Sequence, residues 1–220
     1  LADLLNQQIN HELEAYYAYL AMAAWSESED YPGIATWMKN QAQEELIHMM
    51  KIFNFLAEAG VTMEMKALAA PQNKFKSVEE MFKAGLKHEE TQSQRFYKLQ
   101  ALALKHNSYH VQNELQWFIS EQVEEEASFN SILRKISRLK DHPAGMVFLD
   151  QELGQRPAPT PPPRTGETVD LPFPPAVAPE AGPQLATAAA SCANRACSLR
   201  RWASSIQSRT SFLVAGVSRA

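Results

Sequence analysis

The sequence predicts an all-α fold: four long helices with one long crossover between the second and third, followed by a short fifth helix. Two observations carry this prediction. Apolar residues recur at spacings of three and four along four long stretches between residues 1 and 140. The links between these stretches are short, long and short in turn. Two helical hairpins joined by a crossover are the simplest bundle with such links.

The first two helices are predicted to form a hairpin. The first runs over residues 1–27, and the polar loop at 28–30 leads to Pro32, which suits the first turn of a helix. The second helix ends near Ala59, where Gly60 supplies a stop signal. The stripes that predict these helices are Leu5, Ile9, Glu12, Tyr16, Tyr19 and Ala23, then Met38, Ala42, Glu45, Met49, Ile52 and Leu56.

The third and fourth helices form the second predicted hairpin. Residues 77–80 read as a capping box that opens the third helix, which continues to about Lys105. The fourth begins at 107–108 and is ended by Pro143, and residues 144–153 form the short fifth helix. The stripes are Phe82, Leu86, Glu89 and Phe96, then Val111, Leu115, Phe118, Gln122, Glu125, Phe129, Leu133 and Ile136.

The link over residues 61–76 sets the topology. A helix of about 27 residues is roughly 40 Å long. Sixteen extended residues reach at most about 50–58 Å. The link can therefore span the bundle and return the third helix parallel to the second.

The composition changes after residue 155. Ten of the 13 prolines fall between Pro157 and Pro183, and lysine is absent after Lys140. We therefore expect residues 1–155 to form the folded domain and 156–220 to be a disordered tail. Three interpretations of the tail are open. It is a natural extension, a segment that binds a partner or directs targeting, or the product of out-of-frame translation of GC-rich DNA. Its surplus of Ala, Pro and Arg favours the last.

The charge distribution limits the kinds of partner that the protein can bind. The chain has a net charge of −4; residues 1–156 carry −7 and the remainder +3. An acidic body argues against nucleic acid and anionic membrane surfaces. Both cysteines lie in the tail, there is no signal-peptide pattern, and no run of about 18 apolar residues occurs, so we expect a cytoplasmic protein. Because the chain begins at Leu1, we expect N-terminal residues to be missing.

Ionisable residues interrupt the apolar stripes of all four long helices. A buried carboxylate costs several kcal/mol without a compensating partner, so four such helices suggest shared cations. Glu45 and His48 are three residues apart and can grip one ion, which Glu12 can complete. Glu89 can hold a second ion that Glu45 bridges. Oxygen-rich ligation with one imidazole suits iron and also tolerates zinc or manganese.

Simpler interpretations fit some of these residues and not others. Acidic runs are usually solvated, which fits Glu126 and Glu114, but Glu45 lies between Ala42 and Met49 on the core stripe. Isolated histidines are usually structural, and Met49 and Met50 favour packing over haem ligation. That interpretation is accepted for His11, His88, His106, His110 and His142. Tyr19, seven residues after Glu12, lies on the same face and is a candidate redox-active phenol.

Several segments together resemble the bacterial non-haem ferritins over about residues 1–155. They are Asn10–Leu13, Ala42–His48, Lys87–Glu89, Gln116–Glu126 and Phe148–Leu153. Bacterioferritins and many di-iron oxygenases differ, since they carry a second Glu-x-x-His where this chain has the histidine-free stretch 121–125. The small DNA-protecting shell proteins lack this within-helix site and the fifth helix.

The resemblance implies a ferritin-like bundle with an intra-subunit di-iron ferroxidase centre and no haem. Glu12, Glu45 and His48 would hold the first iron, and Glu45, Glu89 and Glu125 the second. Gln122 would lie beside bound oxygen, and Tyr19 would be the tyrosine next to the centre. The third iron site would use Glu44, Glu121, Glu124 and Glu125. The family oxidises Fe(II) with O2 or peroxide and stores ferric mineral in a homo-oligomeric shell of about 24 subunits.

Two other functions compete with iron storage. A di-iron peroxidase or oxygenase would need a substrate pocket, but four phenylalanines are predicted to fill the core. They are Phe82, Phe96, Phe118 and Phe129. The other alternative is a non-catalytic interaction protein that acts through its tail, which also puts the assembly of a full shell in question.

Overall fold

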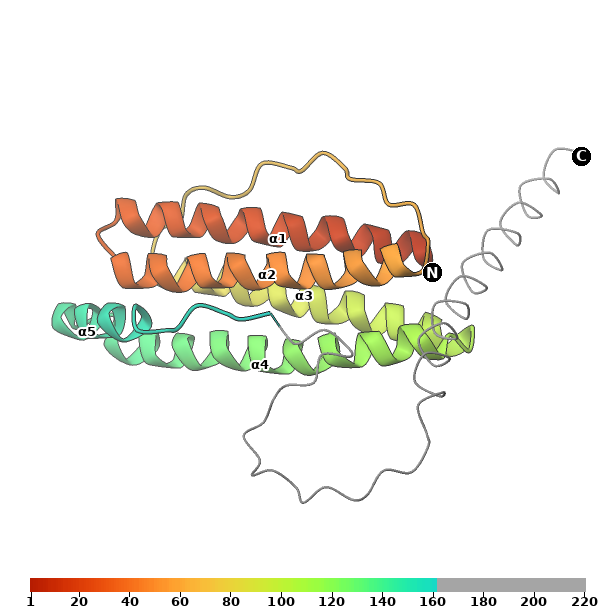
Figure 1. The fold of residues 1–220 in the computed structure, drawn as a ribbon. Coiled ribbons are helices and arrows are strands. Elements are labelled where there is room, and N and C mark those ends of the chain that lie inside the picture. Colours follow the sequence, from red (N-terminus) through yellow and green to blue (C-terminus); the bar gives the residue numbers. More distant parts are fainter. Residues whose placement is uncertain (162–220) are drawn as a thin grey trace, which may run out of the picture. The chain divides into compact units, whose positions relative to one another are not determined.

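The computed structural model describes residues 1–161, and these residues form five helices (Figure 1). The predicted boundaries lie within about two residues of those observed, except that α4 ends at Leu139 and not at Pro143. Most of the predicted tail, residues 162–220, lies outside the described residues. The helices are α1 (Ala2–Ser28), α2 (Pro32–Glu58), α3 (Val78–Lys105), α4 (Tyr109–Leu139) and α5 (Pro143–Leu153).

The helices form the two predicted hairpins. Figure 1 shows α1 and α2 side by side and antiparallel. The crossover runs along the length of α1, so that α3 begins at the same end of the bundle as α2 and runs parallel to it. Two asparagines of α1 hold the extended crossover by pairing with its backbone. Asn6 accepts from the Glu64 N–H at 2.9 Å and donates to the Glu64 carbonyl at 3.1 Å. Asn10 accepts from the Lys66 N–H at 2.7 Å.

Local sequence signals explain where the helices start and reverse. The Ser77 hydroxyl accepts from the Glu80 N–H at 3.1 Å and caps the first turn of α3, as predicted. The Glu80 carboxylate accepts from the Lys76 N–H at 2.7 Å, one residue before the position that a capping box uses. Asp30 and Asn107 turn the two hairpins with φ values of 60° and 52°. Asp and Asn tolerate this left-handed region better than other side chains do.

Two aromatic clusters flank the middle of the bundle. Phe96 and Phe118 stack with their ring centroids 4.8 Å apart. On the other side of the polar positions along α3 and α4, Phe129 packs edge-on against Trp37 with centroids 5.0 Å apart and also contacts Phe82. The four phenylalanines are fully buried, as predicted. The buried polar positions of α3 and α4 between the clusters, Glu89, Gln122 and Glu125, are therefore shielded from water at both ends.

The predicted stripes contain three positions that are only half-buried. They are Tyr16, Leu86 and Leu133. On α4 the neighbouring Ile132 is buried, at 5% exposure, where Leu133 was expected. The buried residues of α4 alternate in steps of four and three up to Ile136, whereas the predicted stripe took two successive steps of four before Leu133.

Helix α5 docks against the start of α2. The Asp150 carboxylate accepts from the Ile34 N–H at 2.8 Å, which satisfies a donor left free in the first turn of α2. Gly33 makes this approach possible, because an added Cβ would lie 1.8 Å from the Asp150 carbonyl oxygen. The absence of a side chain at residue 33 thus sets where α5 lies.

Gly33→Ala should destabilise the protein by about 1–3 kcal/mol, because the methyl group must push α5 away. This outcome opposes the usual gain from replacing a helical glycine with alanine. Urea unfolding would measure it, with Ser120→Ala on an exposed face of α4 as the control. Equal stabilities of Gly33→Ala and the parent protein would contradict the proposed docking constraint.

Candidate metal centre

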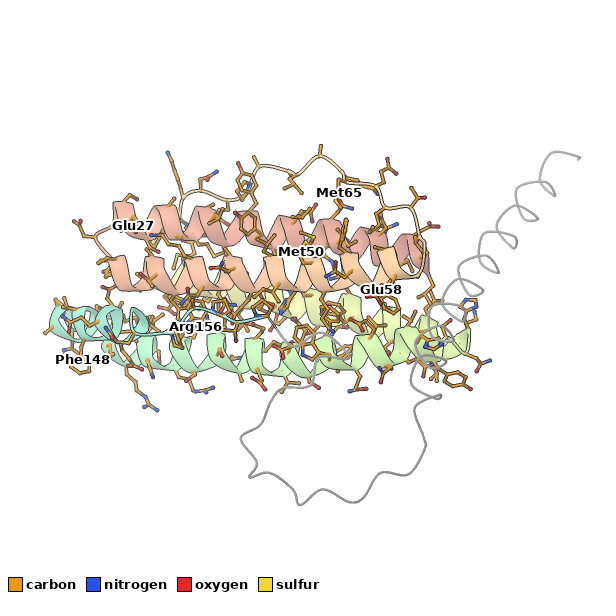
Figure 2. The ribbon with its side chains drawn as sticks, in the orientation of Figure 1. Glu27, Met50, Glu58, Met65, Phe148 and Arg156 are labelled. Atoms are coloured by element: carbon orange, nitrogen blue, oxygen red, sulfur yellow. The ribbon has the colours of Figure 1, made fainter. Side chains whose placement is uncertain are left out.

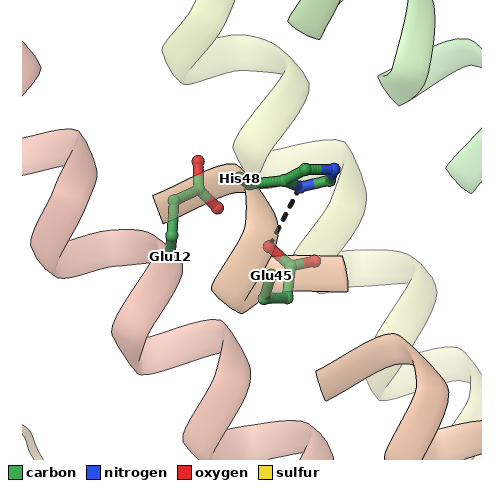
Figure 3. A group of neighbouring side chains, drawn as sticks. All are labelled: Glu12, Glu45 and His48. Carbon is green, nitrogen blue, oxygen red and sulfur yellow. Dashed lines mark ion pairs between the residues drawn. The ribbon is translucent and has the colours of Figure 1, made fainter. Parts of the chain in front are cut away.

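Three side chains that the sequence analysis singled out meet in the middle of the bundle (Figure 3). Glu12 comes from α1, and Glu45 and His48 come from one turn of α2. Each offers a ligand atom, and these atoms all lie within 4.8 Å of one another. The three residues are 1%, 1% and 3% exposed. Two carboxylates and an imidazole at this spacing suit a divalent cation.

Buried amides orient Glu12. Gln8, one turn earlier on α1, donates to Glu12 Oε1 at 2.8 Å. Gln92 on α3 donates to Glu12 Oε2 at 2.6 Å, and Arg95 in turn donates to Gln92 Oε1 at 2.8 Å. The amides fix the carboxylate while leaving it lone pairs with which to bind a metal.

The carboxylate of Glu45 gives the strongest support for a cation at this site. Its Oε2 lies 3.5 Å from His48 Nδ1, but its Oε1 is buried and has no hydrogen-bond partner. A buried, unpaired carboxylate oxygen is costly, and a metal ion would satisfy it. The residues present therefore fit a metal at this position.

A second group of buried polar residues joins α3 and α4 next to these three. The Tyr19 hydroxyl donates to Glu89 Oε1, and Gln122 donates to Glu89 Oε2 at 3.1 Å. Glu125 accepts from Gln41 at 2.7 Å. Glu89, Gln122 and Tyr19 are at most 2% exposed and Glu125 is 6% exposed. All four residues face the interior, as the stripes predict.

The electrostatics of the metal-free protein favour neutral carboxyl groups. Burial, and then repulsion from Glu125, raises the pKa of Glu89 to about 8. Burial also raises the pKa values of Glu12 and Glu45 well above the usual range, with further repulsion from Glu45 and Glu89 respectively. For the Tyr19 phenol, burial and then the charge of Glu89 raise the pKa as well. The centre thus holds protons that a cation can replace.

The remaining predicted metal residues do not join the compact cluster. Among residues 1–161, the group whose ligand atoms all lie within 4.8 Å is Glu12, Glu45 and His48. Glu44 instead forms an ion pair with Arg156 at 2.7 Å. Glu121 is half-buried and Glu124 is exposed. For Glu121, burial is the largest cause that raises the pKa.

The residues that support the centre were not among those predicted from the sequence. Gln8 and Gln41 precede Glu12 and Glu45 by one helical turn, so a search for amides at that spacing could have found them. Gln92 follows Glu89 by three residues and could have been found similarly. Arg156 lies outside every helical stripe and gave no such signal.

The fold and this centre define a class of protein: a four-helix bundle with a carboxylate-rich candidate metal site in its interior. Residues 2–139 match the ferritin family, described as a ferritin-like domain. The chain is 39% identical over 156 residues to a bacterial non-heme ferritin of Staphylococcus aureus (strain MRSA252), which covers 71% of this chain and 94% of that protein. The chain belongs to the ferritin family.

Further relatives and solved structures agree. A bacterial non-heme ferritin of Staphylococcus haemolyticus (strain JCSC1435) is 38% identical over the same length and coverage. An open-pore ferritin from Archaeoglobus fulgidus superposes with a TM-score of 0.70 at 36% identity, covering 71% of this chain and 96% of that one. The predicted ferritin-like fold is therefore confirmed. Within residues 1–161, no helix is long and apolar enough to cross a membrane.

The raised pKa of Glu89 predicts a pH-dependent stability of the metal-free protein. Between pH 4.5 and about 8 the folded state keeps a proton that the unfolded chain has lost, so the free energy of unfolding falls as pH rises. Glu89→Gln removes this titration and should reduce the loss between pH 5 and 8 by about 1–3 kcal/mol.

Urea unfolding at several pH values, after removal of metal with a chelator, would measure this effect. Glu90→Gln is the matched control, because Glu90 is the exposed neighbour of buried Glu89. Parallel stability curves for Glu89→Gln and the parent protein would show that Glu89 does not titrate as described.

Proposed function

We propose that this protein oxidises Fe(II) with O2 or peroxide at an intra-subunit di-iron centre and stores the ferric product in an oligomeric shell. The observation that carries the proposal is the buried convergence of Glu12, Glu45 and His48, with Glu45 Oε1 unpaired, in a chain of the ferritin family. Iron is the substrate and the cargo of this reaction.

The placement of the side chains supports the following ligand assignment. Glu12, Glu45 and His48 hold the first Fe(II). Glu45 bridges to the second, which Glu89 and Glu125 hold. Two ferrous ions supply one electron each, which is sufficient for a two-electron reduction of O2. The anionic carboxylates stabilise the greater charge of the ferric products.

Proton release accompanies iron binding at this centre. Glu12, Glu45 and Glu89 have raised pKa values and hold protons before iron enters. A carboxyl group must lose its proton to ligate a metal, so loading the centre expels these protons. Gln122 and Tyr19 remain hydrogen-bonded to Glu89 and fix its orientation. Because the Tyr19 hydroxyl bonds to Glu89, a proposed iron ligand, Tyr19 also acts as a one-electron donor to the centre.

The finer assignments belong to the same proposal. Glu44, Glu121, Glu124 and Glu125 form a third iron site that exchanges iron with the dinuclear centre. The protein acts in the cytoplasm as a homo-oligomer of about 24 subunits, without haem. Residues 1–155 form the ferritin domain.

Complete burial of the core phenylalanines supports iron storage over an oxygenase. Phe96 and Phe118 stack on one side of the centre, and Phe82 and Phe129 pack on the other. All four are 0% exposed, so the flanks that an organic substrate would need are occupied by protein.

Anaerobic loading with Fe(II) followed by air tests the function. We expect rapid oxygen use at about two Fe(II) per O2, then retention of hundreds of ferric ions per soluble particle. Glu45→Ala should slow the fast phase by at least about 100-fold, because it removes a ligand from both ions and even outer partners of ligands are worth about 10- to 100-fold.

Stopped-flow absorbance would follow the oxidation, with Glu90→Ala as an exposed control. A normal fast phase in Glu45→Ala would refute the ligand assignment. Fast oxidation without retained iron would favour the peroxidase or oxygenase alternative, and oxidation no faster than in buffer would leave only a binding role.

Glu124→Ala should separate the third site from the dinuclear centre. We expect the first oxidation phase to keep its rate and the recovery of activity between successive iron additions to slow by a few-fold, because only the transfer of iron is impaired. Sequential additions in the stopped-flow experiment measure both quantities. Loss of the first phase would place Glu124 in the dinuclear centre instead.

A further inference from the structure

The chain turns back along α2 after α5 (Figure 1). The turn starts at Gly154, where an added Cβ would lie 3.0 Å from the Cα of Gly33. Asn40, a buried residue of α2, then donates to the carbonyl oxygens of Arg156 and Pro157 at 3.1 and 3.2 Å. The backbone at Arg156 is therefore held against α2 by specific contacts.

The Arg156 side chain, which is labelled in Figure 2, makes three further contacts with α2. Its Nη2 donates to both carboxylate oxygens of Glu44, at 2.8 and 2.7 Å, and its Nη1 donates to Gln41 Oε1. The guanidinium carbon lies 4.9 Å from the centroid of the Trp37 ring. Arg156 and Glu44 are only 25% and 21% exposed, so water screens the pair weakly.

These contacts place Arg156 beside the residues proposed for the third iron site. Both oxygens of Glu44 already have a cationic partner. Gln41, which accepts from Arg156, also donates to Glu125 at 2.7 Å. A guanidinium has donors only and stays protonated, so it can neutralise Glu44 but cannot ligate a metal.

We propose that Arg156 is the built-in counter-cation of Glu44 and a positioning residue that sets the affinity of the third site. A divalent ion gains Glu44 only when the guanidinium leaves it, so the two cations compete for one carboxylate. Arg156 holds Glu44 and, through Gln41, Glu125 in place while the third site is empty. This inference rests on the proposed function, because it assigns Glu44 to an iron site.

Zn(II) titration of the metal-free full-length chain by calorimetry tests the proposal. We expect two tight equivalents and a weaker third. Arg156→Gln should raise the affinity for the third Zn(II) by about tenfold or more, which corresponds to the free energy of one charge-assisted hydrogen bond. Arg156→Lys should fall between, since it keeps the charge but loses the planar fork. Lys39→Gln removes an exposed cation of α2 that pairs with Glu27, and should change nothing.

A double-mutant cycle shows whether Arg156 acts through Glu44. In a Glu44→Gln background, Arg156→Gln should no longer change the third equivalent. Circular dichroism and binding of the first two Zn(II) ions report whether each variant is folded. If Arg156→Gln does not fold, the third-site affinity of Arg156→Lys tests the proposal in its place.

Four outcomes would overturn the proposal. The first is an equal affinity for the third Zn(II) in Arg156→Gln and the parent protein, and the second is the same gain in affinity in Lys39→Gln. The third is an undiminished effect of Arg156→Gln in the Glu44→Gln background, and the fourth is the absence of a third bound Zn(II) in every variant. Absence of the two tight equivalents from the parent protein would count against the dinuclear centre itself and so against the proposed function.

Discussion

The structure depends on the burial of acidic side chains between two aromatic clusters. Glu12, Glu45 and Glu89 are at most 1% exposed, in a region where ionised carboxylates repel one another and lack water. Such groups persist only when they are protonated, hydrogen-bonded or bound to cations. The metal-free protein uses the first two means, as the raised pKa of Glu89 and its bonds to Tyr19 and Gln122 show. The unpaired Oε1 of Glu45 remains available to bind a cation.

The partners of these carboxylates follow a pattern of charge. Close to the centre the donors are neutral, with Gln8 and Gln92 on Glu12. A neutral amide fixes a carboxylate without supplying the positive charge that would compete with a metal. Cations stand one step away: Arg95 bonds to Gln92 rather than to Glu12, and Arg156 pairs with Glu44 at the edge of the centre. The carboxyl groups of the centre therefore have no competing cation beside them and can exchange their protons for an incoming ion.

The sequence predicted what local rules control. Helix boundaries, the helix cap at Ser77 and the inward placement of the Glu45 and His48 pair depend on spacing within one helix, and the structure shows all three. Contacts between segments distant in sequence could not be predicted in this way. Gln92 reaches Glu12 across 80 residues and Arg156 reaches Glu44 across 112, so neither pairing has a period or a cap to indicate it.

Packing at one end of the bundle is physically connected to the chemistry of its middle. Gly33 permits α5 to approach α2, and Asp150 locks that approach through the Ile34 N–H. The chain leaves α5 at Gly154, beside Gly33, and two residues later Arg156 reaches Glu44. A close glycine contact thus fixes where a guanidinium sits some three turns along α2. Because α5 and the segment after it belong to one continuous chain, any force that displaces α5 also acts on the cation that neutralises Glu44.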